Sequence, residues 1–272
     1  DSHKLCRFIA LFFALITLAL CWPLVSHFNP GDYQYQVVED YNWVPMFHLR
    51  YALGVDGISL LFVVLTGFTN VIVILAAWGS IRYKVPQYLA IFLFATGMMN
   101  AVFCATDSIL FYVFWEAGMV PVYLAIGMWG GQKRTYAAMK FFLFTFLGSI
   151  FMLVAIVYMN FKTHSFAIAD FQNVNFSHTE SQWIFWGLLV AFAVKVPMWP
   201  VHTWLPDAHT EAPAGGSVVL AALMLKLGGY GLLRFSMPIV PGVHANYQWL
   251  LIFLSLVAVI YVGFASIMQK DM

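Results

Sequence analysis

The sequence predicts an all-α polytopic membrane protein. Of its 272 residues, 62% are hydrophobic and only 9% are charged, and the mean hydropathy is +0.82. Soluble globular proteins usually carry about 25% charged residues. A helix needs about 20 largely apolar residues to cross a bilayer. The chain offers about eight such stretches, which leave little room for a soluble domain: 7–26, 57–79, 87–106, 108–129, 138–161, 183–205, 213–233 and 247–268.

The distribution of basic residues supports these spans, because Lys and Arg favour the cytoplasmic side of a membrane. If the first stretch starts inside, eight basic residues lie on the inner side: Lys4, Arg7, Arg82, Lys84, Lys133, Arg134, Lys140 and Lys270. Three lie on the outer side: Arg50, Lys162 and Arg234. Lys195 and Lys226 fall within spans and complete the thirteen. We therefore expect an even number of spans, with both ends of this chain in the cytoplasm.

Several classes of function are disfavoured. The net charge is +1 and the sequence has no basic run, so nucleic acid is not an expected partner. Cys6, Cys21 and Cys104 have no Cys-x-x-Cys pairing, which argues against a disulfide framework or a cysteine metal site. Heme ligation by two intramembrane histidines is not expected, because only His202 is near a span interior. We find no nucleotide fingerprint or hydrolase triad.

The connections between spans are expected to be mainly structural. The first stretch follows Asp1 and lacks a small-residue cleavage site, which favours a transmembrane helix over a signal peptide. Residues 27–56 are interpreted as an acidic outward loop. Asp56 and Asp107 each stand just before a span, where a carboxylate caps a helix N-terminus. Tyr112, Trp115, Tyr123, Trp199 and Tyr230 are interpreted mostly as packing residues and interface anchors.

Three ionisable residues stand far from the ends of their apolar stretches: Glu116, Lys195 and Lys226. A charge at the centre of a bilayer costs about 2.5–3.5 kcal/mol on insertion scales. Such residues usually mark ion or proton pathways. We therefore predict that these side chains carry protons.

Glu116 lies nine residues beyond Asp107, so it is about 14 Å along a helix and near the midplane of a ~30 Å hydrocarbon core. A carboxyl at this depth can hold a proton, and a nearby ammonium would restore its charge. The alternative is a protonated glutamic acid that only forms a hydrogen bond to a neighbouring helix.

Lys195 is followed by Pro197 and Pro200, which remove two N–H donors and should leave the carbonyls of residues 193 and 196 unpaired. We expect the helix to break there and a hydrated pocket to lie beside the amine. The alternative is a lysine that extends to the membrane surface.

Lys226 lies thirteen residues after Pro213 and is interpreted as a second buried amine, the next station of a relay. Gly228, Gly229 and Gly231 follow it and would allow close helix approach or local unwinding. The alternative is a structural ion-pair partner.

His202 lies seven residues after Lys195 and could extend the relay. The equally weighted alternative is a structural residue held by hydrogen bonds. Asp207, His209 and Glu211 are interpreted as parts of a satisfied turn.

Three segments carry a resemblance to a known family: LGVDGISLLFVVLTGF, FYVFWEAGMVPVYLAIGMWG and AFAVKVPMWPVHTWLPDAHTEAPAGGSVVLAALMLKLGGYGLLRFSMP. They resemble the antiporter-like subunits of respiratory complex I, most closely the subunit M or chain 4 type of NADH-quinone oxidoreductase. The resemblance runs from about residue 50 to the end.

The resemblance implies a proton-pumping membrane subunit without a cofactor of its own. NADH, flavin, iron-sulfur clusters and quinone are then expected in partner subunits, and neighbouring antiporter-like subunits and the lipid bilayer are the expected surroundings. It also implies that Glu116, Lys195, Lys226 and His202 match the family's relay residues. A bacterial plasma membrane is the favoured location, and a mitochondrial inner membrane is the alternative.

The resemblance also implies what this chain lacks. Family members have about fourteen helices in two inverted five-helix repeats. We expect N-terminal helices and an outward loop in 1–85, one complete repeat in 86–235, and the start of a second half in 236–272. One helix before Asp1 and the second repeat's proton exit are then missing, so this chain alone would not complete a transmembrane proton path. Two rivals stay open: a subunit of a cation/proton antiporter or membrane-bound hydrogenase, and a structural membrane scaffold.

Overall fold

The computed structural model describes residues 2–32, 34–47 and 49–268, and confirms a largely helical chain. Asp1 and Lys270, which the sequence analysis used, lie outside these residues. The first part contains α1 (Ser2–His27), β1 (Gln36–Val44), the 3-10 helix η1 (Pro45–Phe47), β2 (Leu49–Val55), α2 (Gly57–Ser80), α3 (Val85–Cys104), α4 (Ser108–Ala117) and α5 (Met119–Trp129). The second part contains α6 (Arg134–Thr163), α7 (Ile168–Gln172), α8 (His178–Lys195), α9 (Trp204–Glu211), α10 (Ala214–Val219), α11 (Leu225–Gly231), α12 (Met237–Ile239), α13 (Pro241–Val257) and α14 (Gly263–Ile267), with π-helical segments η2 (Leu220–Met224), η3 (Leu232–Ser236) and η4 (Ala258–Val262).

Seven helices of the described chain are long and apolar enough to cross a membrane. They correspond to all the predicted spans except 183–205. That stretch is not one continuous helix, because α8 ends at Lys195 and the chain passes through turns before α9 begins at Trp204. The prediction of eight spans therefore becomes seven long helices and one interrupted segment.

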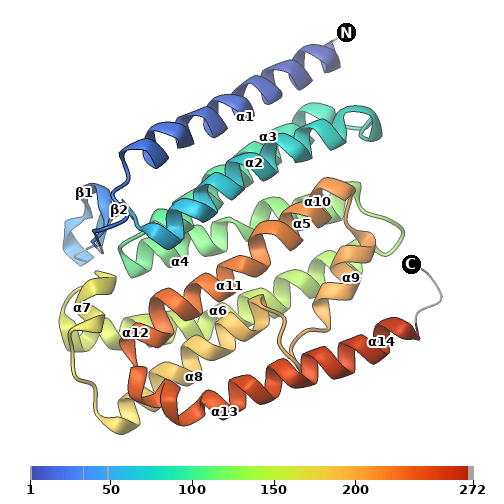
Figure 1. The fold of residues 1–272 in the computed structure, drawn as a ribbon. Helices are drawn as coiled ribbons and strands as arrows, with labels where there is room; N and C mark the ends of the chain where they lie inside the picture. Colours follow the sequence, from blue (N-terminus) through green and yellow to red (C-terminus); the bar gives the residue numbers. More distant parts are fainter. Residues whose placement is uncertain (1, 33, 48, 269–272) are drawn as a thin grey trace.

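The long helices lie side by side, with α1 at one edge of the bundle and α13–α14 at the opposite edge (Figure 1). A two-stranded sheet lies at one end of the bundle beside α7 (Figure 1). It occupies most of the segment that we expected to be an acidic loop. β1 pairs antiparallel with β2, and Asp40 of β1 forms an ion pair of 2.7 Å with Arg50 of β2. The acidic and aromatic residues of this segment were interpreted as an interfacial loop, although its aromatic and β-branched residues also favour strands.

Both predicted aspartate caps are confirmed. Asp107 Oδ1 accepts hydrogen bonds from the backbone N–H groups of Ile109 and Leu110 at 2.9 and 3.0 Å. Asp56 caps α2 in the same way through Ile58 and Ser59. The other carboxylate oxygen of Asp56 lies 2.8 Å from Arg234 of η3, so this cap also joins two distant parts of the chain.

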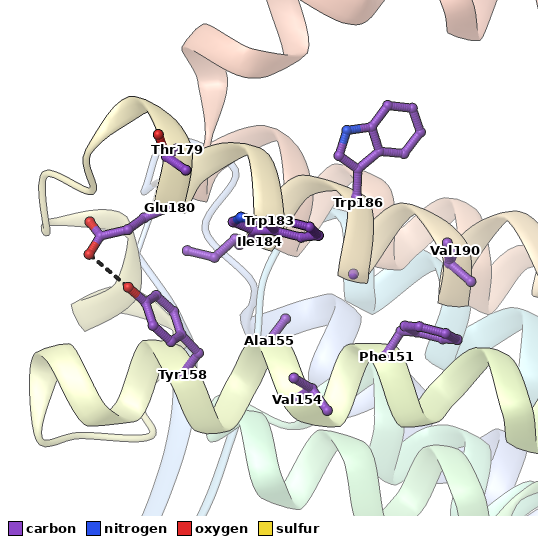
Figure 2. Close-up of a pocket in the computed structure, with 11 residues that line it drawn as sticks. Phe151, Val154, Ala155, Tyr158, Thr179, Glu180, Trp183, Ile184, Trp186 and Val190 are labelled. Carbon is purple, nitrogen blue, oxygen red and sulfur yellow. Dashed lines mark hydrogen bonds between the residues drawn. The ribbon is translucent and has the colours of Figure 1, made fainter.

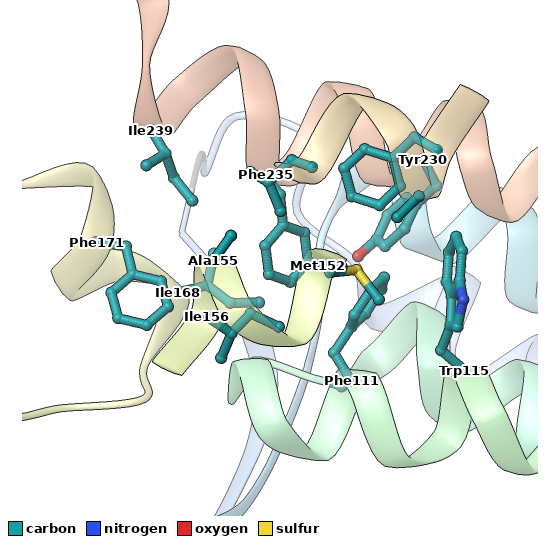
Figure 3. Packing of buried hydrophobic residues seen from close by; sticks show 14 of the residues in the cluster. Phe111, Trp115, Met152, Ala155, Ile156, Ile168, Phe171, Tyr230, Phe235 and Ile239 are labelled. Carbon is teal, nitrogen blue, oxygen red and sulfur yellow. The ribbon is translucent and has the colours of Figure 1, made fainter. Parts of the chain in front are cut away.

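A buried aromatic core connects α4 with the second half of the described chain. Phe111 of α4 packs against Phe235 of η3 with ring centroids 4.5 Å apart, and Trp115 packs against Phe192 of α8 at 5.8 Å. Figure 3 shows Phe111, Trp115, Tyr230 and Phe235 gathered around the same interior. This core places α4 next to the C-terminal half of α8.

Glycines allow α11 to approach α8 closely, as the sequence predicted. A Cβ atom on Gly228 would lie 2.6 Å from Val196 Cγ2 and 3.0 Å from the Phe192 carbonyl oxygen. A Cβ atom on Gly231 would overlap the Phe192 ring. In contrast, a Cβ atom on Gly229 would meet nothing within 4 Å. The tight contact therefore depends on two of the three glycines.

We predict that Gly228→Ala destabilises the protein by about 1–3 kcal/mol, because the backbone of α8 cannot move away from the added methyl group. Gly229→Ala is the matched control, and it should be neutral or slightly stabilising because alanine favours helix by about 1 kcal/mol over glycine. Thermal unfolding of the purified membrane protein, followed by tryptophan fluorescence, distinguishes the two variants. Equal stability of both variants would contradict this account of the α8–α11 contact.

Candidate functional site: a buried lysine at a helix break

Glu116 lies on α4 one residue before that helix ends, and Gly118 separates it from α5. Its carboxyl faces the Ser149 hydroxyl of α6, which is buried. Its Oε1 atom is buried and forms no hydrogen bond with another protein atom. The Asp107 cap and the α4 helix thus place a carboxyl inside the bundle with few fixed partners.

Lys195 is the last residue of α8, and only 1% of its surface is exposed. Its Nζ atom lies 4.9 Å from the centroid of the Trp115 ring. An ammonium at this distance from an indole is attracted by the ring's negative face, by about 2 kcal/mol in desolvated sites. Lys195 Nζ forms no hydrogen bond with another protein atom.

Glu116 and Lys195 therefore lie in one site without direct pairing. Glu116 is adjacent in sequence to Trp115, whose ring lies beneath the ammonium. The carboxyl and the amine are close enough for a Coulomb interaction. This arrangement allows the strength of the interaction to change with small movements of α4 or α8, because no short ion pair fixes the two groups together.

The helix break after Lys195 is confirmed, although its hydrogen bonding differs from the prediction. The Ala193 carbonyl, which we expected to be unpaired, accepts a bond of 2.8 Å from the Met198 N–H. The Val194 carbonyl accepts a bond of 2.9 Å from the indole Nε1–H of the buried Trp204. The prediction was wrong for Ala193, because the chain makes a wider turn before Pro200.

His202 lies in the turns between α8 and α9 and is partly buried. Its ring packs edge-on against Tyr261 of η4, with centroids 5.8 Å apart. Its Nδ1 atom is buried without a hydrogen bond from or to another protein atom. Among the described residues, no hydrogen bond at Nδ1 supports the structural role that we considered for His202. Its role in proton transfer stays a prediction.

Lys226 differs from the prediction, because its side chain is exposed instead of buried. Leu223, Met224 and Leu227 turn into the bundle, and Lys226 lies on a face that the described residues leave uncovered. Its ammonium donates a hydrogen bond of 2.6 Å to the carbonyl of Ala221. That carbonyl belongs to the π-helical segment η2, a type of local widening that is frequent at functional sites.

The segment around His209 forms helix α9 where the sequence analysis expected a turn, and its acidic side chains are satisfied as predicted. Asp207 forms an ion pair of 2.7 Å with Lys140 of α6. Glu211 accepts a hydrogen bond of 2.8 Å from the Lys133 backbone N–H. Burial lowers the pKa of His209, because it disfavours the charged imidazolium. These contacts fix α9 to the start of α6.

Two residues of the site were missed as functional candidates. Trp115 was interpreted as packing, yet its ring lies under the Lys195 ammonium. Ser149 was not singled out, although a serine in the apolar middle of a membrane helix is a signal for a polar neighbour. Both residues are identified only when α4, α6 and α8 are brought together.

Within the described ranges, no group of three or more His, Cys, Asp or Glu side chains is arranged to hold a metal ion. The site is instead a carboxyl, an amine, an indole ring and a hydroxyl. These groups can hold, orient and exchange a proton.

Comparisons with known proteins agree with the resemblance seen in the sequence. The family model described as NADH:quinone oxidoreductase/Mrp antiporter, TM, matches residues 105–272. NADH-quinone oxidoreductase subunit M of Rhodobacter capsulatus is 44% identical over 98% of this chain and 54% of its own length. NADH-ubiquinone oxidoreductase chain 4 of Chondrus crispus is 39% identical over 100% of this chain and 55% of its own length.

A chain of respiratory complex I from Thermus thermophilus has the same fold, with a TM-score of 0.87 and 29% identity over 98% of this chain and 56% of that chain. The present chain thus spans about half the length of the curated relatives it matches. The family model covers well over half of the chain, and the two curated relatives are 44% and 39% identical to it over nearly its whole length. The chain therefore belongs to the NADH:quinone oxidoreductase/Mrp antiporter transmembrane family.

Proposed function

We propose that this chain forms the proton-translocating first half of a membrane subunit of an NADH:quinone oxidoreductase. The observation that carries the proposal is the fully buried Lys195 ammonium, which lies over Trp115 and near Glu116 without a direct ion pair. Isolated ionisable groups inside a membrane are expensive and mark functional sites. NADH oxidation and quinone reduction, with their flavin and iron-sulfur clusters, are assigned to other subunits of the assembly.

In this proposal, Glu116 and Lys195 act as a coupled pair. When the carboxylate lies close to the ammonium, the lysine retains its proton. When movement of a neighbouring subunit separates the two charges, the buried lysine releases the proton. Trp115 stabilises the ammonium in the first state, and in the second the Ser149 hydroxyl, which donates to the Phe146 carbonyl at 2.8 Å, turns toward the carboxyl.

Lys226 receives the proton in the lateral direction in this proposal. Its amine is held near the π-helical segment by one backbone carbonyl and is accessible from outside the described bundle. The close α8–α11 contact keeps the helices that carry the two lysines together. His202 provides a branch from Lys195 toward the cytoplasmic side. We assign the relay to the repeat 86–235, with 1–85 and 236–272 flanking it.

The neighbouring partners in this proposal are other antiporter-like subunits of the same complex, within a bacterial inner membrane or a mitochondrial inner membrane. A cation/proton antiporter or a membrane-bound hydrogenase would use the same buried groups. Copurification of NADH-oxidising activity with the chain separates these possibilities from the proposed assembly. A structural scaffold would instead tolerate replacement of Glu116, Lys195 and Lys226 together.

We predict that Lys195→Met or Glu116→Gln in the intact complex abolishes the proton transfer of this subunit. The number of protons moved per electron, measured in inverted membrane vesicles, should fall while the complex still assembles. Arg82→Gln, an exposed basic residue of an inner loop, is the control and should retain normal stoichiometry. Unchanged stoichiometry in both buried-site variants, with normal assembly, would overturn the relay.

We predict a graded effect of replacing Trp115. Trp115→Phe retains a weaker ring interaction with the ammonium, whereas Trp115→Leu removes it, and the loss of about 1–2 kcal/mol corresponds to a roughly tenfold slower pumping turnover. The pH profile of turnover should shift in the leucine variant and much less in the phenylalanine variant. If both variants lose activity equally with an unshifted profile, Trp115 has a packing role only.

A further inference from the structure

A second site lies on the opposite side of α8, away from Trp115 and the buried amine. Helices α6 and α8 enclose a groove of about 630 Å³ between Phe151, Val154 and Tyr158 on α6 and Glu180, Trp183 and Val190 on α8. Figure 2 shows these side chains arranged along the two helices, with Glu180 and Tyr158 at one end and Val190 and Phe151 at the other. Nothing in the proposed proton relay uses this groove.

The length of the groove matches one leaflet of a membrane. On α8 it runs from Glu180 to Val190, ten residues or about 15 Å of helix. The hydrocarbon core of a bilayer is about 30 Å thick, so the groove extends from the membrane boundary to about the midplane. A transmembrane helix of another protein would cross both leaflets, whereas a lipid chain occupies one. The dimensions therefore fit an acyl chain.

The groove is apolar at its end near the membrane midplane and polar at its end near the membrane boundary. Near the midplane its walls are Phe151, Val154 and Val190. At the other end, close to the Ser177 cap that begins α8, stand Thr179 and Glu180. Trp183 lines the groove one turn from Glu180 and is 74% exposed, the position that tryptophan favours at a membrane boundary.

The polar end carries one negative and one positive group. Glu180 Oε1 lies 2.7 Å from Lys162 Nζ and accepts a hydrogen bond of 2.7 Å from the Tyr158 hydroxyl. The short contacts with Lys162 and Tyr158 favour the ionised form of the Glu180 carboxyl. Lys162 is 43% exposed and has two further N–H donors. An anionic ligand alone would meet the carboxylate, whereas a zwitterion offers a partner to each charge.

We propose that this groove binds one acyl chain of a zwitterionic phospholipid with a primary amine, such as phosphatidylethanolamine. The phosphate accepts hydrogen bonds from Lys162, and the ammonium of the headgroup donates to Glu180. The acyl chain lies along Val154 and Trp183 toward the midplane. This inference requires that α6 spans the membrane and that α8 lies beside it within the bilayer, and its evidence is separate from the evidence for the proton relay.

The test uses the full-length subunit in its native complex, purified with a mild detergent. Val154→Trp fills the groove, and Val157→Trp places the same side chain on α6 outside it. Val154 and Val157 are 63% and 52% exposed, so both variants should fold. We expect the first variant to lose bound phosphatidylethanolamine, measured by mass spectrometry of the retained lipids, and the second to retain it as the wild type does.

Headgroup recognition is tested by reconstituting the complex in nanodiscs of phosphatidylethanolamine mixed with phosphatidylcholine or phosphatidylglycerol. Glu180→Gln, which keeps the helix cap, and Lys162→Gln should each reduce retention of phosphatidylethanolamine by roughly tenfold. Equal loss in the Val154 and Val157 variants would overturn the groove as the binding site. Equal or better retention of phosphatidylglycerol, or a protein subunit cross-linked to Cys in Val154→Cys, would overturn the proposed occupant.

Discussion

The arrangement of this protein depends on how it satisfies the backbone where α8 ends at the buried Lys195. A carbonyl or N–H group that is buried without a hydrogen-bond partner costs several kcal/mol. The wider turn at Met198 and the indole of Trp204 supply the missing hydrogen bonds for Ala193 and Val194. Because these partners stabilise the break, the helix can end at Lys195 and leave its amine free of the backbone.

The two lysines have opposite surroundings for reasons of packing. Lys195 is enclosed because α8 lies between α6 and α11, and glycines bring all three helices close. A Cβ atom on Gly148 would lie 3.1 Å from Val194 of α8, and one on Gly228 would lie 2.6 Å from Val196. Lys226 lies on the far flank of α11, which the described residues do not cover. The described residues alone therefore position the Lys195 amine. The Lys226 amine is free to contact a neighbouring helix or subunit.

Much of the fold could be predicted because each helix has its own local signal. Long apolar stretches define the spans, Asp56 and Asp107 mark helix starts, and Pro197 and Pro200 mark the break. The β1–β2 hairpin was missed because the acidic and aromatic residues of 27–56 were interpreted as an outward loop at the interface. The orientation of Lys226 was also missed, because burial of one helical face depends on which neighbours pack against it, and the local sequence does not specify them. For the same reason, Trp115 and Ser149 become parts of the site only through the tertiary contacts of α4 with α6 and α8.

Helix α8 combines two chemically different faces, and this explains why its position matters. One face presents Phe192 and Lys195 to α4 and α11, and the other contributes Trp183 and Val190 to the groove with α6. Gly187 lets α8 approach α6 closely beside the groove, because an added Cβ atom there would lie only 3.0 Å from the Phe151 carbonyl oxygen. A filled groove opposes outward movement of α8, since an empty apolar groove loses dispersion contacts on both walls. The distance between Glu116 and Lys195 therefore depends on packing at both faces of the same helix.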